Sequence, residues 1–288
     1  MLMVAAVMEV RVLTNIRRAL KKMCSALELN RKIVGVKFLF TEKDFEEADA
    51  KAAKAKLPYC VMVKLATHGY GLKATLATSG CGGGTRALGL EDTKPEFESG
   101  CEYNTFGLYQ DLAIAKNVVN NITFCKHRIY GVMTKPLEAF NDKPDVVIII
   151  TDSYNTMRIV QGYTYKYGTQ TDFKLTGNQA VCSESTAYPF ENNSINISMF
   201  CSGTRYLAGW GKSEIAIGLP YAKFIETADG VYNSINGTEQ NEAKKIIKAR
   251  LKHEKLEDPG IYDNDAYYIR ESKTGKPASE SGHTRVKA

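Results

Sequence analysis

Four of the seven cysteines form two pairs whose spacing and neighbouring residues repeat along the chain. The pairs are Cys60 with Cys81 and Cys182 with Cys201, 21 and 19 residues apart, and equivalent members lie 122 and 120 residues apart. Equivalent loops of two packed halves can meet at one axis, and four cysteine thiolates are the usual ligands of a [4Fe–4S] cluster. We therefore predict that these four cysteines ligate a metal centre, with an iron–sulfur cluster as the best match.

A glycine-rich motif accompanies the second cysteine of each pair. The segment Cys81-Gly-Gly-Gly-Thr-Arg matches Cys201-Ser-Gly-Thr-Arg after a gap of one glycine. Glycine lets backbone N–H groups approach cluster sulfides or an anion, and arginine would offset the negative charge of a thiolate-ligated cluster. The residues that we expect to contact the cofactor are Gly82, Gly83, Thr85, Arg86, Gly203, Thr204 and Arg205.

Other functions could use the same residues. A cysteine thiolate activated by a helix N-terminus and by Arg86 or Arg205 could be the redox or nucleophilic group of an enzyme. The two glycine-rich turns could instead hold an anionic small molecule in a binding module without catalytic activity. A structural role, with each cysteine packed as a small apolar side chain, is a further alternative. Whether the chain is an enzyme therefore stays open at this stage.

The sequence lacks other familiar metal and phosphate motifs. It contains no C-x-x-C pair of the kind that structural zinc sites use, and its four histidines have no paired ligand spacing. The glycine cluster matches neither the P-loop nor the dinucleotide-binding pattern. These features favour an iron–sulfur cluster over zinc or a bound nucleotide.

The elements that must position the cysteines follow the same order twice. For the first half we predict a strand, two helices and a strand, over residues 33–40, 42–56, 59–69 and 72–80. For the second half we predict the same order, over residues 146–151, 153–168, 177–186 and 196–200. Thr41 can cap the first of these helices, and the all-apolar run at 146–151 is typical of a strand buried on both faces.

These patterns predict one compact domain over residues 1–257, of the α/β or α+β class. We expect two pseudo-symmetric halves from an internal duplication, half one at about 30–110 and half two at about 141–225. Flanking helices are expected at both ends of the domain.

The flanking helices and the C-terminal end differ from the two halves. Apolar residues at helical spacing over 13–27 predict the N-terminal helix, and Thr238 can cap the C-terminal helix over 238–255. From Glu271 onward the chain has almost no apolar content, and we predict an extended or mobile tail over residues 258–288.

Composition limits the classes of function. Apolar residues make up 44% of the 288, and Lys plus Arg number 38 against 32 for Asp plus Glu, giving a net charge of +6, so a disordered polyelectrolyte is excluded. No run approaches the roughly 18 apolar residues of a membrane span. An odd number of cysteines without a secretory signal makes a disulfide framework unlikely and favours thiols or metal ligands. We expect a soluble, cytoplasmic protein with no membrane partner.

The basic surplus lies mainly in the two outer helices. In the C-terminal helix acidic residues precede basic ones, an order that complements the helix dipole without any ligand. A solvated face therefore explains the charge better than nucleic acid binding, and we expect no nucleic-acid partner. The leading function implies a redox protein or a cofactor-assembly protein as partner, and a homo-oligomer is compatible with it.

The chain resembles the prokaryotic family known as domain of unknown function 169. The resemblance runs from about Leu13 to about Lys255 and rests on short segments in matching order, namely IVGVKF, GCGGG, SGCEYNTFGLY, PDVVIII, QAVCSES, FCSGTR and GLP. Cys101 and the basic tail depart from the family pattern. The resemblance implies a cytoplasmic protein of anaerobic organisms with recurring cysteines, and it implies no particular reaction.

Overall fold

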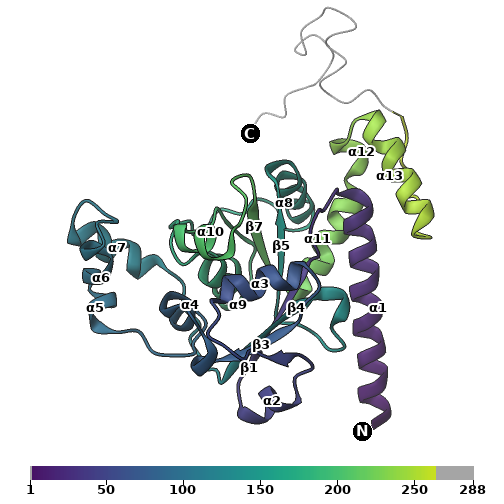
Figure 1. The fold of residues 1–288 in the computed structure, drawn as a ribbon. Helices are drawn as coiled ribbons and strands as arrows, with labels where there is room; N and C mark the ends of the chain where they lie inside the picture. Colours follow the sequence, from purple (N-terminus) through teal and green to yellow (C-terminus); the bar gives the residue numbers. More distant parts are fainter. Residues whose placement is uncertain (1, 264–288) are drawn as a thin grey trace, which may run out of the picture.

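The computed structural model describes residues 2–263, and within them seven strands form one mixed sheet (Figure 1). The order is β2-β3-β4-β1-β5-β7-β6, and every neighbouring pair is antiparallel except β2 with β3. The strands are β1 (Val34–Leu39), β2 (Lys51–Ala52), β3 (Leu72–Thr75), β4 (Gly131–Pro136), β5 (Val146–Thr151), β6 (Asn196–Ser198) and β7 (Ile215–Pro220). The predicted mixed α/β class is therefore confirmed.

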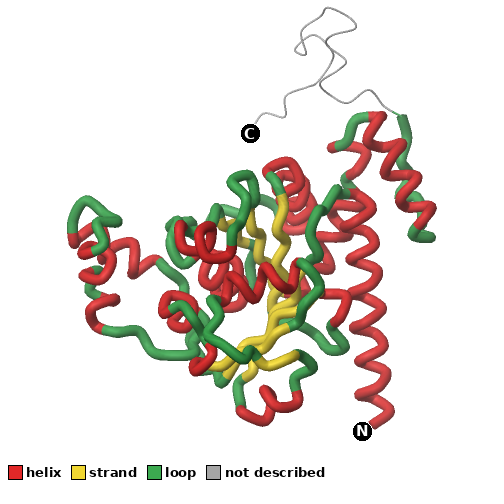
Figure 2. The backbone as a smooth tube through the Cα atoms, in the orientation of Figure 1, coloured by secondary structure: helices red, strands yellow, loops and turns green. Residues whose placement is uncertain are grey.

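Helices cover both faces of the sheet (Figure 2). In β5, Val147 and Ile149 pack into one core while Val146, Ile148 and Ile150 pack into the other, as strand alternation requires. The first face carries α1 (Leu2–Ala26), α8 (Ser153–Tyr167), α11 (Tyr221–Asn233), α12 (Ile235–Thr238) and α13 (Asn241–His253). The second face carries α3 (Tyr59–Thr67), α4 (Gly82–Ala87), the π-helix η3 (Ala180–Ala187), α9 (Tyr188–Asn192) and α10 (Ser202–Ala208).

Three short helices form a separate cluster beside the sheet (Figure 1). They are α5 (Pro95–Glu98), α6 (Cys101–Thr105) and α7 (Leu112–Asn121), with Phe97 and Tyr103 in a small core of their own. They lie between α4 and β4, whereas the connection from α10 to β7 is only a short loop. The other short elements are α2 (Glu42–Glu47) and the 3-10 turns η1 (Leu76–Thr78) and η2 (Leu137–Ala139).

The two halves contribute strands in the same order. The sets β3-β4-β1 and β6-β7-β5 meet where β1 pairs with β5. The first residue of β1 pairs with the last of β4, as the first residue of β5 pairs with the last of β7. Both β3 and β6 begin opposite the fourth residue of their neighbour. The strands therefore have a pseudo-two-fold relation, while an internal duplication as its origin stays a prediction.

The first half extends further along the chain than we expected. Its middle strand, β4, lies at 131–136, outside the expected range of 30–110. The helical cluster α5–α7 separates this strand from the glycine-rich motif, so the sequence repeat ends before the structural half does.

Two predicted helices have different bounds in the structure. Thr41 caps α2 as predicted, but the helix ends at Glu47 instead of continuing to 56, because β2 pairs with β3 in its place. The Lys73 ammonium group, donating to carbonyl oxygens of Phe45 and Ala48, satisfies the helix end. The C-terminal helix is α13, which begins after Gln240, so the predicted Thr238 cap is wrong, since Thr238 ends α12.

Only the start of the predicted tail falls within the described residues. Residues 258–263 form neither helix nor strand, and Ile261 is buried against the first core. The Asn236 side chain hydrogen-bonds the backbone on both sides of Ile261, donating to the Gly260 carbonyl oxygen and accepting from the Tyr262 N–H. Residues 264–288, the rest of the predicted tail, lie outside the described residues.

No helix within residues 2–263 combines the length and the apolar content that a membrane crossing needs. The 25-residue α1 is included in this finding.

Candidate thiol site

The four repeated cysteines line a single cavity of about 360 Å³ on the second face of the sheet. Cys60 lies in the first turn of α3 and Cys182 in the π-helix η3, a helix type often found at functional sites. Cys81 and Cys201 are the N-cap residues of α4 and α10. The chain therefore brings together four thiols that are up to 141 residues apart in sequence.

Each side of the cavity combines elements of both halves. The helix that contains Cys60, α3, packs against α10, and α4 packs against η3. Each of these two contacts joins a helix of the first half to a helix of the second half. The Cys182 thiol lies 4.0 Å from the carbonyl oxygen of Gly83, and the Cys60 thiol hydrogen-bonds the Thr204 side chain. The cavity would not exist in either half alone.

Two of the thiols are held in their neutral form. Burial, with a smaller contribution from nearby Cys81 and Cys201, raises the pKa of the Cys60 thiol to about 11. Burial also raises the pKa of Cys182 well above its ordinary value, with the three other thiols adding to the shift. Cys182 therefore lies within electrostatic reach of the three other thiols.

Cys201 has a different environment. Its sulfur accepts a hydrogen bond from the backbone N–H of Thr204 at 3.2 Å and lies 3.0 Å from the Thr204 hydroxyl. These contacts fix the position of the Cys201 sulfur at the start of α10.

The predicted cofactor contacts divide into two groups. Gly83, Arg86, Gly203 and Thr204 line the cavity, whereas Gly82, Thr85 and Arg205 do not. The Thr85 hydroxyl donates to the carbonyl oxygen of Gly82 at 2.8 Å.

Neither arginine presents a free positive charge to the thiols. Arg86 lines the cavity, but its guanidinium makes two hydrogen bonds to the Glu102 carboxylate, at 3.1 and 2.9 Å. Arg205 donates to the backbone carbonyl oxygens of Met199 at 2.9 Å and Glu214 at 3.3 Å, and so joins the segments before and after α10. We expected both arginines to offset the negative charge of the cluster. Only Arg86 lines the cavity, and it is already paired with Glu102.

Several cavity residues were not identified by the sequence argument. One wall comes from the α6 region, with Glu102, Tyr103, Phe106 and Leu108. Others come from Tyr59, Asn178, Gln179 and Leu207. The segment SGCEYNTFGLY, which includes the α6 wall, was noted only as a family segment. Because α5–α7 have no counterpart in the second half, a search for repeats could not find them.

Gln179 joins this wall to η3. Its backbone adopts the left-handed region at φ 50°, and its side chain is 6% exposed. The amide Nε2 donates to the Tyr103 hydroxyl at 2.9 Å, while Oε1 is buried and no described residue donates to it. The Glu184 carboxylate accepts from the backbone N–H groups of Thr176 and Gly177, which fixes the preceding turn.

The remaining cysteines lie elsewhere. All seven are free thiols, and Cys24, Cys101 and Cys125 do not line the cavity. Within residues 2–263, no three His, Cys, Asp or Glu side chains converge closely enough to hold a single metal ion. Ligation by the four cysteines thus stays a prediction.

Comparisons with known proteins agree with the resemblance found in the sequence. The family model described as "Uncharacterised ArCR", domain of unknown function 169, matches residues 22–230. The chain is also 26% identical over 218 residues to an uncharacterised protein, MJ0308, of Methanocaldococcus jannaschii, covering 75% of this chain and 93% of that protein. No solved structure matches. Because the family model matches well over half of the chain, this protein belongs to the domain of unknown function 169 family.

Proposed function

We propose that the cavity binds an iron–sulfur cluster, most simply [4Fe–4S], through Cys60, Cys81, Cys182 and Cys201. The observation that carries the proposal is that four thiols, two from each half, line one cavity. A cubane places each thiolate on a different iron atom, so it needs four thiols around a space, whereas a single ion needs ligands that converge on one point.

The charges around the cavity bear on the role of such a cluster. The Arg86–Glu102 pair contributes no net charge, and Arg205 is engaged away from the cavity. Reduction would therefore add negative charge, and the described residues that line the cavity include no unpaired cation to offset it, which favours a low reduction potential. Bound there, the cluster would supply one-electron chemistry, and electron transfer or cofactor handling in an anaerobic pathway is the role that we propose.

The surroundings of the cavity suit a protein partner. Phe106 and Leu207 line the cavity and are 68% and 52% exposed. Exposed apolar side chains beside a redox centre offer a contact surface to a redox or cofactor-assembly protein. A cytoplasmic setting is part of the proposal, because reduced thiols persist there.

Anaerobic purification tests the proposal. We expect brown protein with about four iron and four sulfide per chain, the composition of a [4Fe–4S] cluster. Serine substitution at each of the four cysteines should lower the iron content and the visible absorbance. Cys101→Ser is the matched control, because Cys101 is exposed and does not line the cavity. Colourless, iron-free protein, or a spectrum that none of the four substitutions changes, would refute the cluster.

The contacts of Cys201 favour one alternative. The Cys201 thiol, which accepts a hydrogen bond from the Thr204 N–H, could be a redox or nucleophilic group, as in a cysteine enzyme. In that case iron-free protein would be alkylated by iodoacetamide at Cys201 much faster than at Cys101 near pH 7. If the glycine-rich turns instead hold an anionic small molecule, we expect iron-free protein in which Cys201 is alkylated no faster than Cys101.

A further inference from the structure

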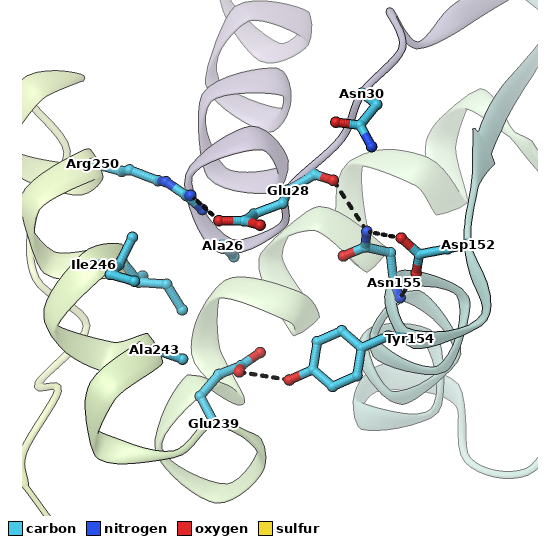
Figure 3. Close-up of a pocket in the computed structure, with 11 residues that line it drawn as sticks. Ala26, Glu28, Asn30, Asp152, Tyr154, Asn155, Glu239, Ala243, Ile246 and Arg250 are labelled. Carbon is cyan, nitrogen blue, oxygen red and sulfur yellow. Dashed lines mark hydrogen bonds and ion pairs between the residues drawn. The ribbon is translucent and has the colours of Figure 1, made fainter.

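A second cavity, of about 320 Å³, lies between the end of α1, the first turn of α8 and α13 (Figure 3). These helices belong to the core on the opposite face of the sheet from the thiols, and the two cavities share no lining residue. A ligand in this second cavity is therefore independent of the proposed cluster.

Asn155 presents an unsatisfied acceptor to this cavity. Its residue is 4% exposed, and both hydrogens of its Nδ2 are engaged, by the carbonyl oxygen of Glu28 and by Asp152 Oδ2, each at 3.1 Å. Because both partners are acceptors, the opposite orientation of the amide is excluded. No group of the described residues donates to Oδ1, which points into the space between Glu28 and Tyr154 in Figure 3.

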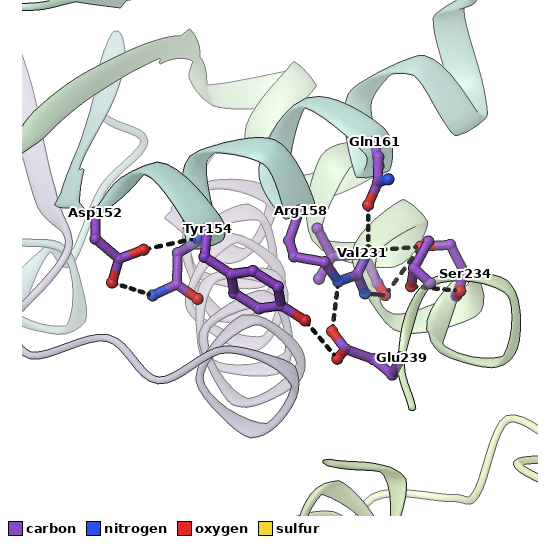
Figure 4. Close-up of polar contacts among 9 residues, drawn as sticks. Asp152, Tyr154, Arg158, Gln161, Val231, Ser234 and Glu239 are labelled. Carbon is purple, nitrogen blue, oxygen red and sulfur yellow. Dashed lines mark hydrogen bonds and ion pairs between the residues drawn. The ribbon is translucent and has the colours of Figure 1, made fainter. Parts of the chain in front are cut away.

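The carboxylates of the cavity are not equally compensated. The buried Arg158 neutralises Glu239, with its Nε 2.5 Å from Oε1 (Figure 4), and Arg250 pairs with Glu28. The Asp152 carboxylate has no ion-pair partner within residues 2–263, and among these residues it accepts hydrogen bonds only from Asn155. The N-terminus of α8 offsets part of its charge. The cavity therefore keeps one carboxylate charge, on Asp152, and one amide oxygen, Asn155 Oδ1, that could accept hydrogen bonds from a ligand.

An apolar wall faces these acceptors. Ala243, Ile246 and Ile247 of α13 line one side, and the Tyr154 ring lies on the other side of the cavity in Figure 3. The Tyr154 hydroxyl donates to Glu239 Oε2 at 2.8 Å, which holds the ring in place. An aromatic face next to a carboxylate attracts organic cations.

We propose that this cavity binds a small organic cation, a primary alkylammonium group with a short apolar chain. The ammonium group donates to Asn155 Oδ1 and to Asp152 beside the Tyr154 ring, and the alkyl chain packs on Ile246 and Ile247. The three donors of an ammonium group match the acceptors that the protein leaves free.

Binding of n-butylammonium to the full-length, iron-free protein tests the proposal. We expect saturable binding by ligand-observed NMR and by calorimetry. n-Butanol and butyrate, which have chains of the same kind without the positive charge, should bind at least about tenfold more weakly, as expected when a carboxylate contacts the ligand charge. Failure of butylammonium to bind, or equal binding of butanol, would overturn the proposal. Neither result depends on iron, so the outcome is separate from that of the cluster.

Two variants locate the binding. Asp152→Asn retains an acceptor and a good helix N-cap but removes the charge, and it should weaken butylammonium binding about tenfold while leaving the melting temperature nearly unchanged. Ile246→Lys places a competing ammonium group at the cavity and should abolish binding. Ile114→Lys is the matched control, since Ile114 is a similarly exposed residue on α7. Unchanged binding in both Asp152→Asn and Ile246→Lys would overturn the assignment.

Discussion

At the residue scale, the environment of Cys60 sets the protonation of the iron-free site. Burial is the largest cause of its raised pKa, and the neighbouring thiols act in the same direction, while the hydrogen bond from Thr204 opposes them. A negative charge on any one thiol therefore disfavours charge on the others. Iron would reverse this preference, because each ligand must lose its proton, so cluster assembly should release protons and proceed better as the pH rises from 7 to 9.

The raised pKa of Cys60 predicts a pH dependence of stability. The folded pKa is about 11 against an ordinary 9.0, so the folded state binds the proton more tightly than the unfolded state. This contribution to the free energy of unfolding is complete below pH 9 and is lost as the pH rises from about 9 to about 11.

Urea unfolding of the iron-free, reduced protein at several pH values between 8 and 11 measures this dependence. Cys60→Ala should show a shallower loss of stability over the same range than the unmodified protein. Identical slopes for the two proteins would contradict the shifted pKa.

At the element scale, two glycines allow α8 and α11 to pack closely on the first face of the sheet. A Cβ atom on Gly162 would overlap the Val231 side chain and the backbone of α11, and one on Gly230 would overlap the backbone of Gly162. Both glycines have ordinary helical backbones, so the close approach of the helices is what requires them. Because α8 follows directly on β5, this contact also fixes Asp152 and Asn155 at the second cavity.

Gly162→Ala should destabilise the protein by about 1–3 kcal/mol, the usual cost of overpacking, in spite of the higher helix propensity of alanine. Gly237→Ala is the control, because a Cβ there meets no atom within 4 Å, and it should be neutral or slightly stabilising. Chemical denaturation monitored by circular dichroism measures both. A neutral Gly162→Ala variant would mean that the helices separate at little cost.

At the scale of the whole molecule, the N-terminal helix α1 and the C-terminal elements both pack on the first face of the sheet. Residues from α1, α11 and α13 share one core, and Ile261 closes it beyond the last helix. The first half, the second half and the C-terminal elements are thus parts of one packed unit. The thiol cavity lies on the other face, where only the two halves meet.

Two truncations from the C-terminus should differ in their effect on the melting temperature. A chain that ends at Ser272 loses a segment with almost no apolar residues, and its melting temperature should stay within about 1–2 °C. A chain that ends at Asp258 also loses the buried Ile261 and should melt about 3–8 °C lower. Calorimetry of the three chains tests this, and equal melting temperatures for the two truncated chains would contradict the role of Ile261.

The sequence by itself determined the features that depend on local patterns. The repeated cysteines and their glycine-rich neighbours predicted two similar halves, and the all-apolar run at 146–151 predicted the buried β5. The Thr41 cap of α2 was also predictable, since capping involves residues only three positions apart. Such features follow from the preferences of neighbouring residues, which can be worked out along the chain.

Tertiary structure alone decided what surrounds the thiols and where the second cavity lies. Arg205 looked equivalent to Arg86, yet one holds a loop and the other lines the cavity, because α5–α7 give only the first half a carboxylate at Glu102. Asn155 became an unsatisfied acceptor only because the end of α1 brought the carbonyl oxygen of Glu28 to its amide. Contacts between residues far apart in sequence depend on packing geometry, which local propensity and periodicity do not specify.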